Sequence, residues 1–450
     1  MVKRDFSSIS RRGVAEIIVE EEFKSLLEEG KPLRLKMGFD PSRPDIHLGH
    51  VVGLRKLHQL QQLGHQVILI VGDWTAQIGD PSGQSATRPM LTADEVRQNA
   101  ETYMEQFFKV VDKEHTQVRW QSEWFGKFGL GDIIKLTSKF TVAQLLARDD
   151  FNKRYKEGKP IAVTEFLYPL LQAYDSVVIE ADVEFGGTDQ KFNILLGREL
   201  QEVMGQRPQQ VFLTPILVGT DGSQRMSKSL GNYIGITDPP NDMYGKMMSL
   251  RDELIMDYFE LVTDVSDDEL KEFQEQLAHR SVNPMELKKH LAREVVAQFH
   301  GAQAASAAER NFTQVFQQRE LPEDVLTIYL SFQALHSQLT LTLTLEQDDV
   351  KREKKVSFGD VGGIGVIHEP GHEPPVKEEV IKVYPADLLF CAELVQSKSE
   401  ARRLLAEGAV DVDGKKVTGD TIEIRDGSMV KVGKRRFAKI VNSDNKSPDS

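Results

Sequence analysis

The stretch "GFDPSRPDIHLGHVVGLRKLHQL" (residues 38–60) joins a tight polar loop to a helical pattern in which leucines recur from Leu54 to Leu60. Apolar residues precede the loop, which predicts a strand, a loop and a helix start in succession. This arrangement is a natural phosphate-binding site, because the first N–H groups of a helix lack intrahelical partners. His47 and His50 lie at the predicted helix start and could donate hydrogen bonds to phosphate oxygens.

The histidine pair has two other interpretations. A metal site would need further ligands, but no third ligand stands at a useful spacing, and the single cysteine, Cys391, excludes a cysteine-based site. Simple packing at a helix start is the other alternative. The surrounding loop favours the phosphate interpretation, and Gly49 would let a flat ring lie close to the backbone.

Composition is that of an ordinary globular protein: 450 residues, 40% hydrophobic, 28% charged and a net charge of −13. This length predicts several domains, and this charge argues against a protein coated in positive charge for nucleic acid. No apolar run approaches the roughly 20 residues that a membrane-spanning helix needs. The N-terminal residues lack the apolar core of a signal peptide, so we expect a cytoplasmic protein with no membrane association.

The pattern of apolar, charged and turn-forming residues changes along the chain. Short apolar runs alternate with helical patterns between residues 33 and 235, which predicts βα units around a parallel sheet, with buried strands within 66–74 and 210–219. An amphipathic helix is predicted over 13–31. Charged helical patterns fill 240–350, and glycine and proline are frequent from 357 to 379.

A second motif is the basic stretch "GTDGSQRMSKSLGN" (219–232), which alone is typical of a solvated loop. Together with His47-Leu48-Gly49-His50 it resembles the two signatures of class I aminoacyl-tRNA synthetases, usually written HIGH and KMSKS. The further stretches "GDPSG" (79–83), "YPLLQAYDS" (168–176) and "GGTDQKFN" (186–193) are similar to those of tyrosyl-tRNA synthetases.

The resemblance implies an α/β fold: a Rossmann-like parallel-sheet catalytic domain, a helical domain and a small C-terminal α+β RNA-binding domain. The expected boundaries are a catalytic domain at 1–239, a helical anticodon-region domain at 240–355, a linker at 356–380 and an RNA-binding domain at 381–450. A helical insertion at about 111–180 is expected to form the interface of a homodimer.

The resemblance also implies that ATP and L-tyrosine react to form tyrosyl-adenylate and pyrophosphate, and that tyrosine then passes to the 3′ end of tRNA(Tyr). The residues expected to act on the phosphates are His47, His50, Lys228, Arg225 and Arg88. Further ATP contacts are expected from Asp40, Gly49, Asp189, Met226, Ser227 and Ser229. Mg²⁺ is expected as a counter-charge, but no protein ligand for a metal is assigned.

For the amino acid, the implied contacts are Lys36, Gly38, Asp80, Tyr168, Gln172, Asp175 and Gln190. Asp175 matches the family residue that meets the phenol hydroxyl. Lys36 stands where better-known members have a tyrosine that meets the same hydroxyl, so the contact would rest mainly on Asp175, or Lys36 would pair with that acid. Gly53 replaces a threonine near the ribose, and Gln84 replaces a basic residue near the pyrophosphate.

Two alternatives to this function are open. Tryptophanyl-tRNA synthetases share both signatures, but an indole has no hydroxyl for Asp175. A catalytically inactive RNA-binding relative is disfavoured by the intact signature residues.

The C-terminal region explains how an acidic protein could hold tRNA, because residues 397–440 carry eleven lysines and arginines against seven acids. A capping box at Ser397 and Glu400, a helix stop at Gly408 and an Asp413-Gly414 hairpin turn are predicted. The residues expected to contact tRNA are Lys398, Arg402, Arg403, Lys415, Lys434, Arg435 and Arg436.

Overall fold

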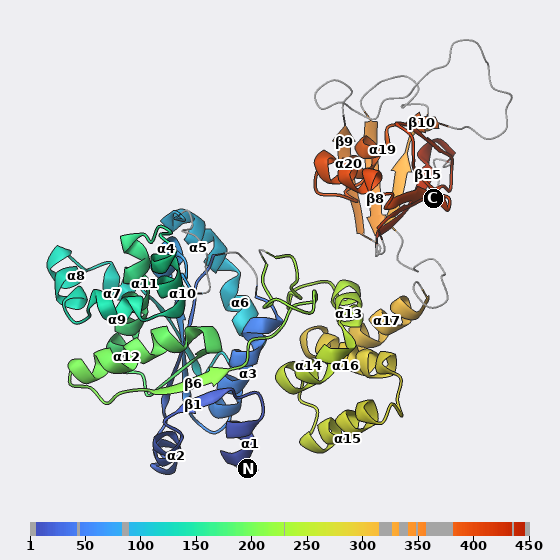
Figure 1. The fold of residues 1–450 in the computed structure, drawn as a ribbon. Helices are drawn as coiled ribbons and strands as arrows, with labels where there is room; N and C mark the ends of the chain where they lie inside the picture. Colours follow the sequence, from blue (N-terminus) through green and yellow to red (C-terminus); the bar gives the residue numbers. More distant parts are fainter. Residues whose placement is uncertain are drawn as a thin grey trace. The chain divides into compact units, whose positions relative to one another are not determined.

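The structure is a computed structural model that describes residues 6–42, 46–82, 90–228, 230–314, 326–332, 341–347, 350–356, 381–433 and 436–445. The chain divides into two compact units, Met1–Phe312 and Thr313–Ser450 (Figure 1). No helix among the described residues is long and apolar enough to cross a membrane.

The first unit contains a six-stranded sheet with the strand order β1-β6-β5-β2-β3-β4. All neighbouring strands are parallel except β1, which runs antiparallel to β6. The strands are β1 (Glu16–Ile18), β2 (Arg34–Phe39), β3 (Gln66–Val71), β4 (Thr116–Trp120), β5 (Val183–Gly187) and β6 (Gln210–Thr214). Strands β3 and β6 are almost entirely buried, as expected for parallel strands covered on both faces. The predicted Rossmann-like sheet is confirmed, as are its strands at 66–71 and 210–214.

Strands β2 and β5 are neighbours, and the chain continues from β2 toward β3 and β4 but from β5 toward β6. The strand order therefore reverses between β2 and β5. In open α/β sheets, ligands bind beyond the carboxyl ends of the strands at this switch point.

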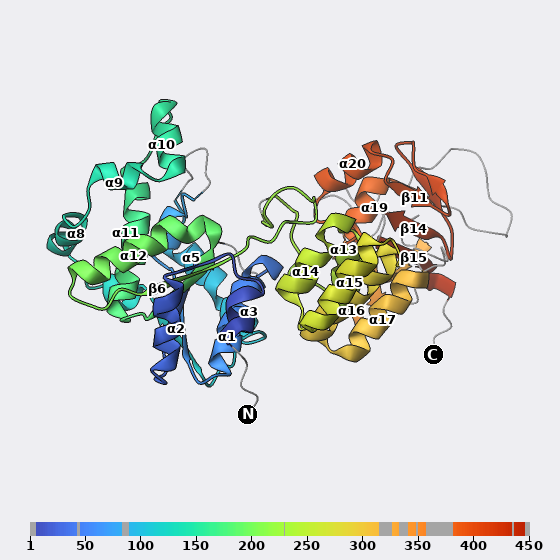
Figure 2. The same ribbon diagram turned by 60° about the horizontal axis from the view of Figure 1, so that its bottom comes forward.

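Helices pack around the sheet. They are α1 (Phe6–Arg11), α2 (Glu20–Glu28), α3 (Leu48–Gln61), α4 (Thr75–Ile78), α5 (Ala93–Glu101), α6 (Tyr103–Phe107), α7 (Ser122–Phe125), α8 (Leu130–Thr137), α9 (Val142–Leu146), α10 (Asp149–Lys156), α11 (Val163–Val178), the 3₁₀ turn η1 (Thr188–Gln190) and α12 (Lys191–Val203). The helix predicted over 13–31 is only partly right, because residues 16–18 form strand β1. Figures 1 and 2 both show α8 and α9 on the side of the sheet away from α13–α17.

The helical region of the first unit follows residue 239. It consists of α13 (Pro240–Met248), η2 (Asp252–Leu254), α14 (Ile255–Val262), α15 (Asp267–Ala278), α16 (Pro284–His300) and α17 (Ala302–Phe312). Its apolar residues belong to the same core cluster as those of α3 and strand β2, so this region packs directly on the first unit's sheet layer.

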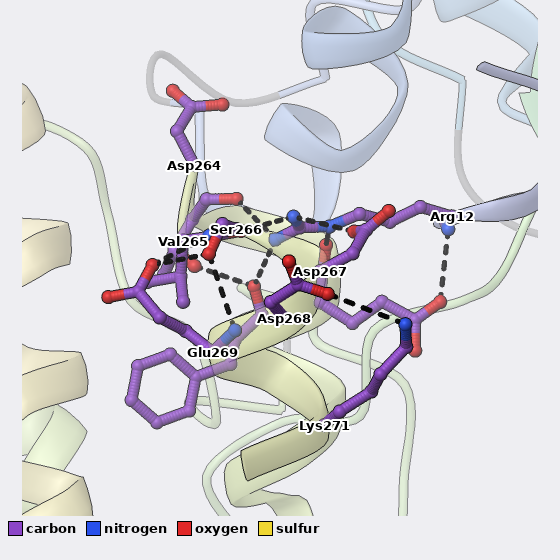
Figure 3. Close-up of polar contacts among 12 residues, drawn as sticks. Arg12, Asp264, Val265, Ser266, Asp267, Asp268, Glu269 and Lys271 are labelled. Atoms are coloured by element: carbon purple, nitrogen blue, oxygen red, sulfur yellow. Dashed lines mark hydrogen bonds and ion pairs between the residues drawn. The ribbon is translucent and has the colours of Figure 1, made fainter. Parts of the chain in front are cut away.

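Arg12 joins the N-terminal segment to the helical region (Figure 3). Its guanidinium donates to the carbonyls of Phe259 (3.0 Å), Glu260 (3.1 Å), Thr263 (2.9 Å) and Val265. The last carbonyls of a helix lack intrahelical partners, so this arginine satisfies the end of α14.

Arg55 of α3 also binds this turn, through the Thr263 carbonyl and, at 2.7 Å, the Asp264 carboxylate. The helix that begins after His47 is thereby fixed to the helical region.

The second unit is built around a seven-stranded sheet with the order β12-β11-β14-β15-β7-β8-β9 and a two-stranded sheet, β10-β13. Its elements are β7 (Leu326–Leu330), β8 (Leu341–Gln347), β9 (Val350–Val356), β10 (Ile381–Val383), α19 (Pro385–Cys391), α20 (Lys398–Ala406), β11 (Val410–Val412), β12 (Lys415–Lys416), β13 (Ile422–Ile424), β14 (Met429–Val432), β15 (Arg436–Asn442) and η4 (Ser443–Asn445). The expectation of a helical region up to residue 355 is wrong beyond Phe312, because β7 pairs with β15 and draws β8 and β9 into the C-terminal sheet.

The predicted signals in the C-terminal region are largely confirmed. The Ser397 side chain caps α20 by accepting from the Glu400 N–H at 3.1 Å, although the Glu400 carboxylate binds the Gln396 N–H rather than that of Ser397. Asp413 and Gly414 both have positive φ (51° and 78°) and connect β11 to β12, as a hairpin turn of this type requires.

Candidate active site

The two histidines form a reciprocal capping box at the start of α3. His47 is the N-cap, and its Nδ1 accepts from the Gly49 N–H at 3.2 Å, while Nδ1 of His50 accepts from the His47 N–H at 3.2 Å. A neutral imidazole that accepts at Nδ1 carries its proton on Nε2. Each ring therefore presents an Nε2–H donor, and the ring centroids lie 4.0 Å apart.

Burial keeps both rings neutral. It lowers the pKa of His50 to about 4, with the nearby Lys228 as a second cause, and it lowers the pKa of His47 well below its usual range. Lys228 and Arg225 also lower the pKa of His47. A Cβ on Gly49 would lie 3.7 Å from the Cβ of Met226, so the basic loop lies beside the histidines. The two signature motifs therefore meet, although about 175 residues of sequence separate them.

Gly49 has a steric role at this corner. A Cβ on this residue would lie 3.0 Å from the ring atoms of His47. The flat ring that lies close to the Gly49 backbone in this structure is that of His47.

Backbone pairing holds the basic loop beside α3. Leu48 N–H donates to the Ile234 carbonyl and Met226 N–H to the Leu217 carbonyl. Asn232 is buried and organises the loop: its Oδ1 accepts from Ser227 N–H (2.8 Å), and its Nδ2 donates to Asp221 Oδ2 (2.7 Å) and to the Arg225 carbonyl (3.1 Å). The Met226 side chain is buried in the core. Arg88 and Ser229 lie outside the described residues, as does Gln84.

Acids gather where β2 and β5 end. Asp40 follows β2 and accepts from the Tyr168 hydroxyl (2.8 Å) and the Thr75 hydroxyl (2.7 Å). Asp189, in η1 after β5, pairs with Arg225 at 2.9 Å, and burial and the nearby Asp80 raise its pKa. Burial and Asp40 raise the pKa of Tyr168 well above its usual value, so this phenol stays protonated.

The Asp80 carboxylate is held by two hydrogen bonds. Its Oδ2 accepts from Gln190 Nε2 at 2.7 Å, and its Oδ1 accepts from the Ser82 N–H at 2.8 Å. Asn193 in turn donates to Gln190 Oε1 at 3.2 Å and accepts from the buried Arg148 at 3.1 Å. Arg148 and Asn193 hold the Gln190 side chain in place, and the sequence analysis did not predict them.

Asp175 lies on α11 and is 2% exposed, so it is a buried acid and not a solvated one on the surface. Its carboxylate accepts from Gln121 Nε2 (2.8 Å) and Trp124 Nε1 (3.1 Å). Burial raises its pKa to about 7, while the nearby charge of Lys36 acts in the opposite direction. The neighbouring Tyr174 packs on Phe125 and Phe128 and so belongs to the aromatic core rather than to the site.

Lys36 does not pair with Asp175. It forms a buried ion pair with Glu184 at 3.0 Å, a partner that the sequence analysis missed. Gly53, the second departure from the family pattern, packs against the end of the Met37 side chain. A Cβ at Gly38 would meet no described atom within 4 Å, which leaves space beside β2.

The comparisons with known proteins agree with this geometry. The family model described as tRNA synthetases class I (W and Y) matches residues 28–317. A tyrosine–tRNA ligase of Dehalococcoides mccartyi strain CBDB1 is 54% identical over 98% of this chain and 99% of its own length. The chain belongs to the tyrosyl-tRNA synthetase family.

A tyrosine–tRNA ligase of Thermotoga maritima is 43% identical over 99% of this chain and all of its own length. The crystal structure of the tyrosyl-tRNA synthetase of Archaeoglobus fulgidus complexed with L-tyrosine superposes with a TM-score of 0.56 at 26% identity, over 67% of this chain and 99% of that one. The activity of this tyrosyl-tRNA synthetase is tyrosine–tRNA ligation, and the tryptophan-specific and inactive alternatives are set aside.

Proposed function

We propose that the acids, histidines and basic loop around the ends of β2 and β5 carry out tyrosine activation as two adjoining half-sites. The observation that carries this proposal is the meeting of the α3 start, the loop at 219–232 and the strand ends at the switch point of the sheet. The tyrosine carboxylate attacks the α-phosphate of ATP, and pyrophosphate leaves. That carboxylate is already ionised, so no general base is needed.

At the nucleotide half-site, the neutral His47 and His50 donate from Nε2 to phosphate oxygens. Lys228 and Arg225 neutralise the charge that builds on the leaving pyrophosphate, and Ser227 and the backbone of Met226 line the loop that brings them there. Asp189, next to Arg225, takes the adenosine side. Positioned donors and charges of this kind act mainly in the transition state.

At the amino acid half-site, Asp175 accepts the phenol O–H of tyrosine. Asp80, Gln172 and the oxygen of Tyr168 accept from the substrate ammonium, and Gln190 contacts the carboxylate or the adenylate. Asp40 supports Tyr168 directly, and Gly38 leaves room for the substrate beside β2.

We assign no resident Mg²⁺ site. Among the described residues no three His, Cys, Asp or Glu side chains form a group that could hold a metal ion. The ion is therefore proposed to arrive with the ATP phosphates, as Mg²⁺ commonly does, and no step is assigned to it.

For the second substrate, we propose that α13–α17 serve the anticodon region of tRNA(Tyr) and that the C-terminal unit binds its backbone. Arg402 and Lys415 are exposed and support this assignment. Lys398 pairs with Asp387 at 2.8 Å, and Arg436 binds the Leu394 carbonyl and Glu400, so both also stabilise the fold. Lys434 and Arg435 lie outside the described residues.

A homodimer is proposed through the helical insertion between β4 and β5. Leu130 and Ile134 lie one turn apart on α8 and are 76% and 58% exposed, and Val142 of α9 is 63% exposed. Apolar side chains gathered in this way commonly mark an interface. The paired change Leu130→Glu with Ile134→Glu should yield monomers in sedimentation experiments.

The family's housekeeping reaction further supports a cytoplasmic location.

Pyrophosphate exchange into ATP, measured with each amino acid in turn, tests the proposal for the first step. Tyrosine alone should support exchange at low concentration, and phenylalanine and tryptophan should not. Exchange with tryptophan as efficient as with tyrosine would overturn the assignment of Asp175.

A further inference from the structure

Lys36 and Glu184 are two fully buried charges in strands whose other buried side chains are apolar. They are register partners on the neighbouring parallel strands β2 and β5, and they are 0% and 1% exposed. The Lys36 ammonium has three acceptors: Glu184 Oε1 (3.0 Å), the Gln172 carbonyl (2.8 Å) and Ser176 Oγ (2.7 Å). An ammonium carries three N–H donors, so all of them are occupied.

Glu184 is equally well satisfied. Besides Lys36, its carboxylate accepts from Gln172 Nε2 (3.1 Å), Ser176 Oγ (3.0 Å) and Gln209 Nε2 (2.5 Å). Ser176 thus accepts from the lysine and donates to the glutamate. Burying an ion pair is tolerated only when the remaining hydrogen bonds are made in this way.

The pair holds one turn of α11. Gln172 and Ser176 lie four residues apart on that helix, and Asp175 lies between them. Asp175 is held separately by Gln121 and Trp124 from the region after β4. The turn that presents Gln172 and Asp175 is therefore held by the ion pair from β2 and β5 and by two neutral donors from the segment that follows β4.

We propose that the buried Lys36–Glu184 pair is a positioning and specificity-determining element, which fixes the α11 turn beneath the tyrosine and supplies the positive charge that offsets the Asp175 carboxylate. This inference rests on the proposed roles of Gln172 and Asp175. Lys36 acts through these residues, because its three donors are already used within the protein.

The charges around Asp175 give the proposal a distinctive signature. Among the described residues, the charged groups that act on Asp175 are Lys36 of β2, which lowers its pKa, and Glu184 of β5, which raises it. Removing the lysine should therefore raise the pKa of Asp175, and removing the glutamate should lower it. Loss of packing alone would affect both variants in the same direction, so shifts of opposite sign report the two charges rather than the packing of α11.

The test measures tyrosine-dependent pyrophosphate exchange with the full chain between pH 5.5 and 9. Lys36→Met should raise the KM for tyrosine about 10-fold or more and leave the KM for ATP within about 3-fold, because breaking a buried pair disturbs the side it supports. The acid limb of kcat/KM for tyrosine should move to higher pH in Lys36→Met and to lower pH in Glu184→Gln.

Should Lys36→Met fail to fold, the double variant Lys36→Met/Glu184→Gln removes both charges together, a change that buried pairs often tolerate. Its acid limb should move upward, by less than in Lys36→Met.

A matched control is the buried pair of Arg154 and Glu165, joined at 3.0 Å near the start of the same helix α11. Arg154→Met should lower the melting temperature but leave the KM for tyrosine and the pH profile unchanged. The variant Asp175→Asn distinguishes a failure of the proposed amino acid site from a failure of the role proposed for the ion pair. If it leaves the KM for tyrosine unchanged, the proposed amino acid site is wrong. If Asp175→Asn weakens tyrosine use but a folded Lys36 or double variant keeps the wild-type KM and pH profile, only the role of the pair is overturned.

Discussion

The two proposed half-sites of this chain are formed by different kinds of residue. At the amino acid end, Lys36, Glu184 and Asp175 are at most 2% exposed, and their polar atoms already have partners inside the protein. At the proposed nucleotide end, the hydrogen bonds that His47 and His50 make to described residues use only Nδ1, and the Arg225 side chain is 40% exposed.

The difference follows from what each end must do. Selecting tyrosine over a similar amino acid depends on buried polar groups that are costly to leave without a partner, so their surroundings must be rigid. Accelerating phosphoryl chemistry depends on donors that meet the charge as it develops, so those donors must remain available. The two ends should therefore respond differently to mutation in one assay, tyrosine-dependent pyrophosphate exchange.

The largest effect is expected at the nucleotide end. His47→Ala or Lys228→Ala should lower kcat for adenylate formation by about 10²–10³-fold, the cost typical of removing one donor to a developing charge. The KM for tyrosine should stay within about 3-fold, because the interaction is made mainly in the transition state. Single-turnover kinetics measure both quantities.

His58→Ala is the matched control, because His58 lies on the same helix, where its ring contacts Gln62. It should keep the wild-type rate. A wild-type kcat for adenylate formation in His47→Ala or Lys228→Ala would show that the replaced residue does not act on the nucleotide.

At the amino acid end the expected effect is smaller and falls on selectivity. Asp175→Asn keeps the size of the side chain but replaces a charged acceptor, which is worth about 1.5–3 kcal/mol, or roughly 10–100-fold in kcat/KM for tyrosine. Phenylalanine makes no hydroxyl contact, so its kcat/KM should change little. Equal losses for both amino acids would place Asp175 away from the phenol.

How much the sequence could predict differs between the same two ends. At the proposed nucleotide end the sequence predicted the course of the chain, because a strand, a loop and a helix start follow one another and because the basic loop has a short local motif. Its geometry is largely local, as the capping box of His47 and His50 shows.

The amino acid end depends on contacts between distant segments. Gln121 and Trp124 reach Asp175 over more than 50 residues, and Glu184 reaches Lys36 over almost 150, so no local pattern announces them. One signal was present: a lysine and a glutamate each interrupt an apolar strand, and buried charges need partners. The helical prediction for 326–356 failed for a similar reason, because the pairing of β7 with the distant β15 decides the structure there.

An intermediate effect is expected from the residue that organises the basic loop. Asn232→Ala removes three hydrogen bonds that hold the backbone of Ser227 and Arg225 and the side chain of Asp221. Loop closure then has a larger entropy cost, and kcat for exchange should fall about 10-fold with little change in the KM for tyrosine. Leu230→Ala, at a half-exposed position of the same loop, is the control and should behave as wild type. An unchanged kcat in Asn232→Ala would show that the loop needs no such support.

The smallest effect on exchange is expected from removing the C-terminal unit, because neither half-site draws a residue from it. The cut belongs after Gln314, since a cut near residue 380 would separate β7–β9 from β15 and leave an exposed strand edge that favours aggregation. The shortened protein should keep tyrosine-dependent exchange within about 2-fold of wild type, while charging of tRNA falls sharply. Its tRNA affinity should also depend less steeply on salt, because each lost phosphate contact lowers the slope of log K against log salt by about 0.7–0.9. Charging as efficient as that of the full chain, across a range of salt, would exclude the C-terminal unit as a tRNA-binding element. A collapse of exchange would instead show that the two half-sites depend on it.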